Sequence, residues 1–283
     1  MTHITLLFVI TFLFVLTGCG PAPTNQTQTT TPTESTTTEA PVEVDKVATT
    51  SSECQYRVGF EAWEPYQFVD IQQQPAGLDI EILQALAAQM NCQLVMTQGN
   101  WTDLVTALKE GQLDVLPAAS KTIARENFAH FSKPYRNEKF VLFVRSANTE
   151  LANYNSLAEF IAAGRKVGIV SDYYYGEELS ELYANPQMKT GFVEAALSEL
   201  NLQRLNDEEI DGMFEDSLVG TSMLRKKGLS NTIGQHSIHL GQTDVYLMFS
   251  KQTVQEPVVE QFNTALDIIR GNGTYQAILA KYQ

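Results

Sequence analysis

The sequence predicts an α/β protein with two lobes that are joined by two strands. After an atypical N-terminal region, the apolar residues follow strand-like and helix-like patterns in alternation, as expected for mostly parallel sheets flanked by helices. About 230 residues with ordinary apolar content form this part, which fits two lobes of roughly 100 residues each better than one core. Two crossings between the lobes would make a hinge, and the cleft at the carboxyl ends of the strands would bind a ligand.

The first residues predict an exported lipoprotein. Residues 1–19 contain an apolar run that is too short to span a membrane in the mature protein. They end in Leu16-Thr-Gly-Cys19, which resembles a lipoprotein signal that is cleaved before a lipid-modified cysteine. Only His3 precedes the apolar run, without Lys or Arg, so export would rest on the charge of the terminal amine. The alternative is a plain N-terminal membrane anchor.

Residues 20–52 predict a disordered tether. Thr, Pro, Ser and Gln dominate this segment, and large apolar residues are almost absent. It therefore cannot bury enough surface to offset the entropy cost of ordering. A flexible chain of this length spans about 30 Å, which lets a globular head reach a partner at the membrane.

The first lobe is expected to contain residues 53–144. A strand at residues 56–60 precedes a helix whose apolar positions, from Leu78 to Met90, recur at every fourth residue. A cationic loop follows a later strand. The remaining expected elements are a strand at 94–97, a helix with Thr102 as its N-cap, a strand at 114–116, the loop with Ser120, Thr122 and Arg125, and a strand at 140–144.

The second lobe, residues 145–244, shows the same alternation, and residues 245–283 return to the first lobe. Each lobe should therefore hold a mostly parallel sheet. The expected elements are strands at 167–170 and 212–214, helices at 194–205 and 217–226, a returning strand at 245–250, and helices at 257–270 and 274–281.

Two cysteines remain once Cys19 carries lipid. Cys54 lies just before the first strand and Cys92 just before the second. Because these strands should be parallel neighbours, both thiols fall at the same end of the sheet. An exported protein favours a disulfide between them, and the alternative is two separate buried thiols.

Charge and motif content exclude several classes of function. The formal net charge of −14 repels nucleic acid and anionic lipid headgroups, so we expect no nucleic-acid partner and membrane contact only through the lipid anchor. His236 and His239 lack a third positioned ligand, so no metal site is predicted. Neither a Ser-His-Asp order, a phosphate-binding loop nor a nucleophilic cysteine stands out. We therefore expect neither a cofactor nor an enzyme.

Several segments resemble those of a known family. The element order from residue 77 to 135, with Ser120-Lys-Thr-Ile-Ala-Arg125-Glu and Phe131-Ser-Lys-Pro-Tyr135, is similar to the periplasmic amino-acid-binding proteins of ABC importers, bacterial solute-binding protein family 3. Ile210–Asp216, Asp244–Lys251 and Gly271–Tyr275 resemble that family's second-lobe strand and closing segment. The resemblance runs from about Cys54 to the C-terminus and implies the type II periplasmic-binding-protein fold.

The resemblance implies which groups hold the backbone of an amino acid. Arg125 would bind the carboxylate, because its planar guanidinium presents a fork of donors to that group. Ser120 would add its hydroxyl and backbone N–H to the same carboxylate. Ala118 would offer its carbonyl to the ammonium, and Asp216 of the second lobe would bind the ammonium with its charge. A zwitterion would thus meet one fixed charge of each sign.

The resemblance also implies contacts to the ligand's side chain. Trp63 and Trp101 match positions where the family places aromatic groups, whose faces accept apolar stems and cations. Glu61 matches an acidic position of members that take polar or cationic amino acids.

The chain departs from the family pattern in three places. Pro117 and Ala118 stand where Ser or Gly is common, so a hydroxyl contact is lost. Lys121 adds a cation near the cleft. Tyr173, after Asp172, stands where the family has a Gly-Thr pair, so a phenol replaces a small hydroxyl in the second lobe.

Taken together, the resemblance implies a monomeric lipoprotein of the periplasm or cell surface that captures an L-amino acid, polar or cationic, and delivers it to an ABC permease. One alternative is a periplasmic enzyme on the same fold, of dehydratase or peptidoglycan-cleaving type, with Glu61 or Asp216 as acid or base. Another is a tethered sensor that presents the ligand to a receptor. Turnover of the ligand would identify the enzyme, whereas the sequence alone does not separate transport, the preferred interpretation, from sensing.

Overall fold

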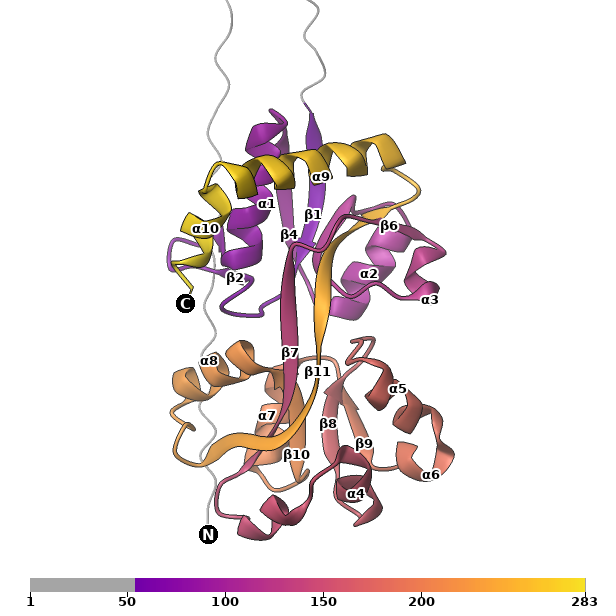
Figure 1. Cartoon of the computed structure of the whole chain (residues 1–283). Coiled ribbons are helices and arrows are strands. Elements are labelled where there is room, and N and C mark those ends of the chain that lie inside the picture. Colours follow the sequence, from indigo (N-terminus) through magenta and orange to yellow (C-terminus); the bar gives the residue numbers. More distant parts are fainter. Residues whose placement is uncertain (1–53, 283) are drawn as a thin grey trace, which may run out of the picture. The chain divides into compact units, whose positions relative to one another are not determined.

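Two lobes joined by a pair of long strands make up residues 54–282, the part of the chain that this computed structural model describes (Figure 1). The predicted signal at residues 1–19, Cys19 and the predicted tether at 20–52 lie outside the described residues. β7 (Arg136–Arg145) and β11 (Ile233–Ser250) run from one lobe into the other and pair in antiparallel fashion. The predicted α/β class and the two-strand hinge are thereby confirmed.

The first lobe has three parallel strands, with antiparallel strands on the hinge side. β1 (Gln55–Phe60) lies between β4 (Gln93–Gln98) and β5 (Val115–Ala119) and is parallel to both. The C-terminal part of β11 pairs with β5 and with β6 (Ala129–Phe131). The other elements are β2 (Phe68–Val69), β3 (Pro75–Ala76), α1 (Leu78–Gln89), α2 (Trp101–Lys109), α3 (Ile123–Glu126), α9 (Glu256–Gly271) and α10 (Thr274–Leu279).

The second lobe repeats this arrangement with its own strands. β8 (Val167–Val170) lies between β9 (Phe192–Ala195) and β10 (Gly212–Asp216) and is parallel to both. β10 also pairs with β7 in antiparallel fashion, which connects the parallel strands to the hinge. The helical elements are η1 (Thr149–Asn153), α4 (Leu157–Ala162), α5 (Glu177–Ala184), α6 (Pro186–Lys189), α7 (Ser198–Asn206) and α8 (Ser217–Lys227).

The helices of the first lobe bury the apolar faces that the sequence predicts. Leu78, Ile82 and Leu86 of α1 are buried, and each such side chain contributes about 1.5–3 kcal/mol through the area removed from water. α9 packs against α1, so the C-terminal segment completes the first lobe. Among residues 54–282, none of the helices combines the length and the apolar character needed to cross a bilayer.

Some predicted local features are wrong. Asn100, not Thr102, caps α2, because its side chain accepts a hydrogen bond from the Asp103 N–H at 3.0 Å. The helix predicted at 194–205 begins only at Ser198, since residues 192–195 pair with β8 as a strand. The strand predicted at 245–250 begins at residue 233, because β11 pairs with β7 along most of its length. In the last two cases long-range strand pairing overrides the local pattern.

The disulfide between Cys54 and Cys92 is present, so that prediction is confirmed. β1 and β4 are parallel neighbours in a register that places Gln55 opposite Gln93, and the two cysteines therefore meet just before these strands. Their Cα atoms lie 4.5 Å apart. The bond closes a loop with a sequence separation of 38 residues within the first lobe.

We predict that removing this disulfide destabilises the first lobe. In the chain-entropy account a loop of this length contributes about 3–4 kcal/mol, because the bond restricts the unfolded chain. The Cys54→Ser/Cys92→Ser double variant should unfold at a lower urea concentration than the wild type. Thiol titration of the denatured, unreduced wild type serves as the control. Equal unfolding midpoints of the two proteins would contradict the prediction. So would a titration that finds the thiols of Cys54 and Cys92 free in the wild type.

Candidate functional site

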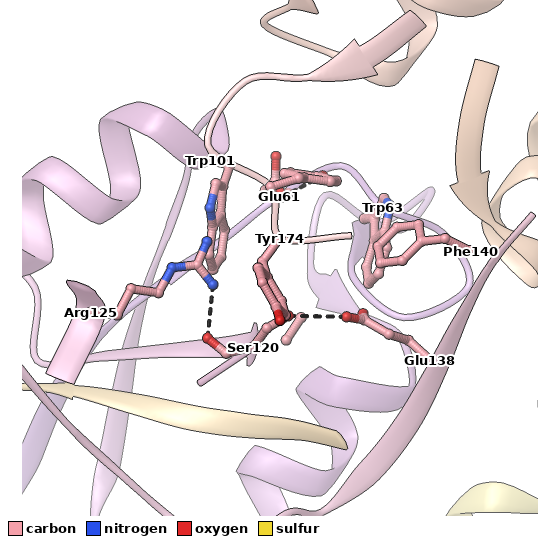
Figure 2. A pocket seen from close by; sticks show the side chains of 10 residues that line it. Glu61, Trp63, Trp101, Ser120, Arg125, Glu138, Phe140 and Tyr174 are labelled. Carbon is pink, nitrogen blue, oxygen red and sulfur yellow. Dashed lines mark hydrogen bonds between the residues drawn. The ribbon is translucent and has the colours of Figure 1, made fainter. Parts of the chain in front are cut away.

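A cavity lies between the two lobes and gathers most of the predicted site residues (Figure 2). The empty space within it amounts to about 300 Å³. Seven of the eight residues predicted to bind the ligand line it, and the exception is Asp216. The lining residues are Glu61, Trp63, Trp101, Ala118, Ser120, Arg125, Glu138, Phe140, Tyr173 and Tyr174.

The fold brings these side chains together because parallel strands end at the same edge of a sheet. Glu61 directly follows β1, and Ser120 directly follows β5. Trp101 is the first residue of α2. Arg125 lies in the short helix α3, which Thr122 caps by accepting a hydrogen bond from the Arg125 N–H at 3.2 Å. Tyr173 comes from the second lobe, in the loop after β8.

The Arg125 guanidinium is buried and bridges the two lobes. Its Nη1 donates to the carbonyl of Ser120 at 2.9 Å, and its Nη2 donates to the carbonyl of Asp172 at 2.7 Å. Its centre lies 5.1 Å from the ring of Trp101. Burial lowers the pKa of Arg125 to about 10, although the charges of Glu138 and Asp172 oppose this shift. The group therefore stays a cation at neutral pH, and three of its five N–H donors remain for a ligand.

Glu61 and Tyr173 meet across the cleft. The Tyr173 hydroxyl donates to Oε2 of Glu61 at 2.8 Å, and its ring makes edge contacts with both Trp63 and Trp101, with centroids 6.3 and 6.1 Å away. Burial raises the pKa of Glu61 to about 8, the hydrogen bond from Tyr173 opposes this shift, and the charge of Glu215 adds to it. A cation bound close to Glu61 would therefore stabilise the ionised form of this carboxyl group.

A buried ion pair supports this side of the cavity. Arg136 of β7 donates to Asp79 of α1 through Nε at 2.7 Å and through Nη2 at 2.9 Å. Its guanidinium also stacks on the ring of Tyr66, with 3.8 Å to the centroid. Gln67 donates to Asp79 at 3.1 Å and accepts the backbone N–H of Glu61 at 3.0 Å. The ion pair is therefore connected to the backbone of a cavity residue.

The sequence interpretation missed three lining residues, Glu138, Phe140 and Tyr174. Two of them lie on β7, where positions 136, 138 and 140 are buried and positions 137 and 139 are exposed. Arg136 and Glu138 stand at alternate positions of this strand, and charged side chains are rarely buried without a partner. This pattern is the signal from which the two lining residues on β7 could have been predicted. Tyr174 neighbours the predicted Tyr173 and carries no separate signal.

Asp216 lies at the start of α8 and is not among the residues that line the cavity. Its Oδ1 accepts the backbone N–H groups of Leu218 and Val219 at 2.9 and 3.2 Å, and its Oδ2 accepts the N–H of Lys139 at 3.3 Å. The carboxylate is thus a helix N-cap. Burial raises its pKa, and the charge of Arg136 opposes that shift.

The other predicted departures have clear places in the structure. Ala118 lines the cavity with a left-handed backbone, φ +60°, and its N–H donates to the hydroxyl of Tyr135 at 3.0 Å. Asp172 is also left-handed, with φ +61°, a conformation that costs a non-glycine residue about 1–2 kcal/mol. Lys121 pairs with Glu126 at 2.9 Å, and its side chain is half exposed. Pro117 is buried within β5.

Further side-chain contacts join the lobes around the cavity. The indole N–H of Trp63 donates to Glu215 at 2.9 Å, and that of Trp101 donates to the carbonyl of Asp172 at 3.1 Å. Lys226 of the second lobe pairs with Glu64 of the first. The arrangement can hold a small molecule that carries both charge signs, because a buried cation and buried carboxyl groups line one space. Within residues 54–282 no cluster of His, Cys, Asp or Glu could hold a metal ion.

Comparison with known proteins points to one family. Residues 56–283 match the bacterial extracellular solute-binding proteins, family 3. A probable histidine-binding protein of Campylobacter jejuni is 24% identical over 210 residues, which are 73% of this chain and 76% of that protein.

Solved structures with the same fold belong to more than one functional class. A histidine kinase sensor domain with similarity to periplasmic binding proteins superimposes with a TM-score of 0.71 and 23% identity, and the match covers 82% of this chain and 96% of that one. An ancestral arginine-binding protein bound to arginine gives a TM-score of 0.69 and 20% identity, with 81% and 97% covered. These structures confirm the type II fold predicted from the sequence.

We predict that the free energy of unfolding falls as the pH rises from about 5 to 8. The pKa of Glu61 is about 8 in the folded protein and near its ordinary value in the unfolded chain, so the folded state binds more protons in this window. Each such group lowers stability by at most about 1.4 kcal/mol per pH unit. Glu61→Gln, which keeps an acceptor for Tyr173, should reduce the slope in urea unfolding.

The matched control for this prediction is Glu178→Gln, because Glu178 is exposed on α5. That substitution should leave the slope unchanged. An unchanged slope in Glu61→Gln would contradict the assignment of a raised pKa to Glu61.

Proposed function

Because this chain belongs to the bacterial extracellular solute-binding proteins of family 3, we propose that it captures an L-amino acid between its lobes and delivers it to an ABC permease. The observation that carries the proposal is the cavity in which the buried guanidinium of Arg125 and the buried carboxyl groups of Glu61 and Glu138 meet. Relatives named for histidine binding and arginine binding support the same ligand class. The ligand would be released unchanged, so we propose a binding protein and not an enzyme.

Arg125 would bind the α-carboxylate of the ligand. Three of its N–H groups have no acceptor among residues 54–282, and a carboxylate can accept two of them side by side. Ser120 would add its hydroxyl or its N–H, and Ala118 its carbonyl toward the ammonium. For the ammonium the resemblance also names Asp216, whose carboxylate caps α8.

Glu61, Trp63, Trp101 and Tyr173 would select the side chain of the ligand. A cationic or polar group can pair with Glu61 and lie against the aromatic rings. An aliphatic side chain would leave the Glu61 carboxyl without a new partner in a dry site, which costs free energy. We therefore propose that polar or cationic amino acids bind better than aliphatic ones.

We further propose that the protein is exported and acts as a monomer that is lipid-anchored at Cys19. The motif that ends at Cys19 and the tether behind it support this proposal, because together they would hold a folded head within reach of a membrane permease. The anchor would be the only contact with the membrane.

A tethered sensor is the second candidate function. The likeness to a histidine kinase sensor domain favours it, since that domain shares the fold over nearly its whole length. Both functions use the same cleft. Uptake of a radiolabelled amino acid by cells that lack the protein distinguishes the two functions. Uptake should fall if the protein serves transport and should not change if the protein is a sensor.

We predict that arginine, lysine, histidine or glutamine raises the melting temperature in a thermal-shift screen, by an amount that grows with the logarithm of its concentration divided by its Kd. Arg125→Ala should then weaken binding of that ligand at least about tenfold, because truncating one partner of a buried charge pair costs about 2–5 kcal/mol. Lys121→Ala is the control, since Lys121 is a half-exposed cation nearby. Unchanged affinity in Arg125→Ala, or tight binding of leucine or valine alone, would contradict the proposed site.

We predict that Cys19 carries the lipid. Cells fed a labelled fatty acid should incorporate it into the wild-type protein, and the protein should fractionate with membranes. Cys19→Ala should lose the label and the membrane association. A labelled, membrane-retained Cys19→Ala protein would show that the anchor lies elsewhere.

A further inference from the structure

We propose that Glu138, on the hinge strand β7, binds the α-ammonium of the ligand. The assignment rests on the proposed function, because it requires an amino acid as ligand. It makes the hinge itself part of the binding site, so that the ligand would contact both lobes and the strand between them.

Ser120 connects Glu138 to the group that would bind the carboxylate. The Ser120 carbonyl accepts from Nη1 of Arg125 at 2.9 Å, and the Ser120 hydroxyl donates to Oε1 of Glu138 at 3.2 Å. Figure 2 shows both hydrogen bonds, with Arg125 and Glu138 on opposite sides of Ser120. A cation and an anion therefore flank one residue of the cavity wall. An α-amino acid carries its ammonium and its carboxylate on the same carbon atom and can span such a pair.

Glu138 also has an oxygen available for a ligand. Oε1 accepts hydrogen bonds from Ser120 and Thr243, whereas Oε2 has no hydrogen-bond partner among residues 54–282. The side chain is 4% exposed and lines the cavity. Asp216 differs in both respects, because its two oxygens accept three backbone N–H groups and it does not line the cavity. The geometry therefore favours Glu138 over Asp216 as the ammonium acceptor.

The cation beside Glu138 is already paired with another carboxylate, so a ligand cation can still pair with Glu138. The positive group on its own strand that acts on Glu138 is Arg136, which is already bidentate to Asp79. Burial raises the pKa of Glu138 to about 7, the charge of Arg136 opposes this shift, and the charge of Asp216 adds to it. The titratable and charged groups that act on Glu138 or respond to it are Arg136, Asp216, Arg125, Tyr66 and Tyr175.

This environment makes ligand affinity depend on pH. The ammonium binds the ionised carboxylate, so protonation of Glu138 competes with the ligand. As the pH falls through about 7, the affinity of the wild type should therefore fall, at least about tenfold between pH 8 and pH 5.5. Glu138→Gln removes this titration and should show a flatter pH dependence.

The test compares Glu138→Gln with Asp216→Asn by isothermal calorimetry. The probes are arginine, lysine, histidine and glutamine, together with their analogues that lack the α-amino group: 5-guanidinopentanoate, 6-aminohexanoate, imidazolepropionate and glutaramate. Gln keeps an oxygen for Ser120 and Thr243. Asn keeps an oxygen for the α8 cap and loses only the acceptor of the Lys139 N–H.

At pH 8 we expect Glu138→Gln to bind the best amino acid at least about tenfold more weakly, while its affinity for the matching des-amino analogue changes less than about threefold. Glu138→Asp, which keeps the charge but shortens the side chain, should lose less affinity and keep the pH dependence. If Glu138→Gln does not fold, the affinities of Glu138→Asp for the amino acid and for its des-amino analogue test the assignment instead.

Equal affinity in the wild type and Glu138→Gln, or a selective loss in Asp216→Asn alone, would overturn the assignment to Glu138 and leave the proposed function intact. If the wild type binds none of the four amino acids, the proposed function fails, and the assignment fails with it.

Discussion

The buried ion pair between Arg136 and Asp79 is the interaction on which the rest of the cleft depends. Both side chains are almost fully buried, and losing one partner would leave an uncompensated charge at a cost of about 3–5 kcal/mol. The pair fixes the hinge strand β7 against the first turn of α1. Because side chains alternate along a strand, the same register places Glu138 and Phe140 on the cavity side. Through Gln67 the pair also supports the backbone of Glu61.

An excess of buried carboxyl groups characterises the cleft. Burial raises the pKa values of Glu61, Glu138 and Glu215 to about 8, 7 and 7, and the cavity offers Arg125 as its cation. Such groups are costly to keep ionised without a partner. A ligand that brings one positive charge for the hinge and a second for Glu61 would satisfy two of them. The electrostatics therefore point to the same ligand class as the aromatic walls do.

The second lobe contributes a backbone carbonyl and a phenol to the cleft. Asp172 gives its carbonyl to Arg125, and Tyr173 places its phenol against Glu61 between the two tryptophans. Tyr173 lines the cavity, where its phenol fills more space than a small hydroxyl would. The left-handed backbone at Asp172 is the local strain that this arrangement carries.

Local patterns in the sequence determined the α/β class, the apolar face of α1 and the cysteine pair before adjacent strands, because periodicity and the position of a residue beside a strand are visible in a linear sequence. The seven predicted residues that line one cavity came from the resemblance of short motifs to a family. Only the tertiary structure decided that Asp216 caps α8, that residues 192–195 form a strand and that Glu138 faces the cavity. The strand at 192–195 depends on its pairing with β8, and the side on which Glu138 lies depends on the register of β7 against β10 and β11. The Asp216 cap depends on the three-dimensional position of its carboxylate at the first turn of α8.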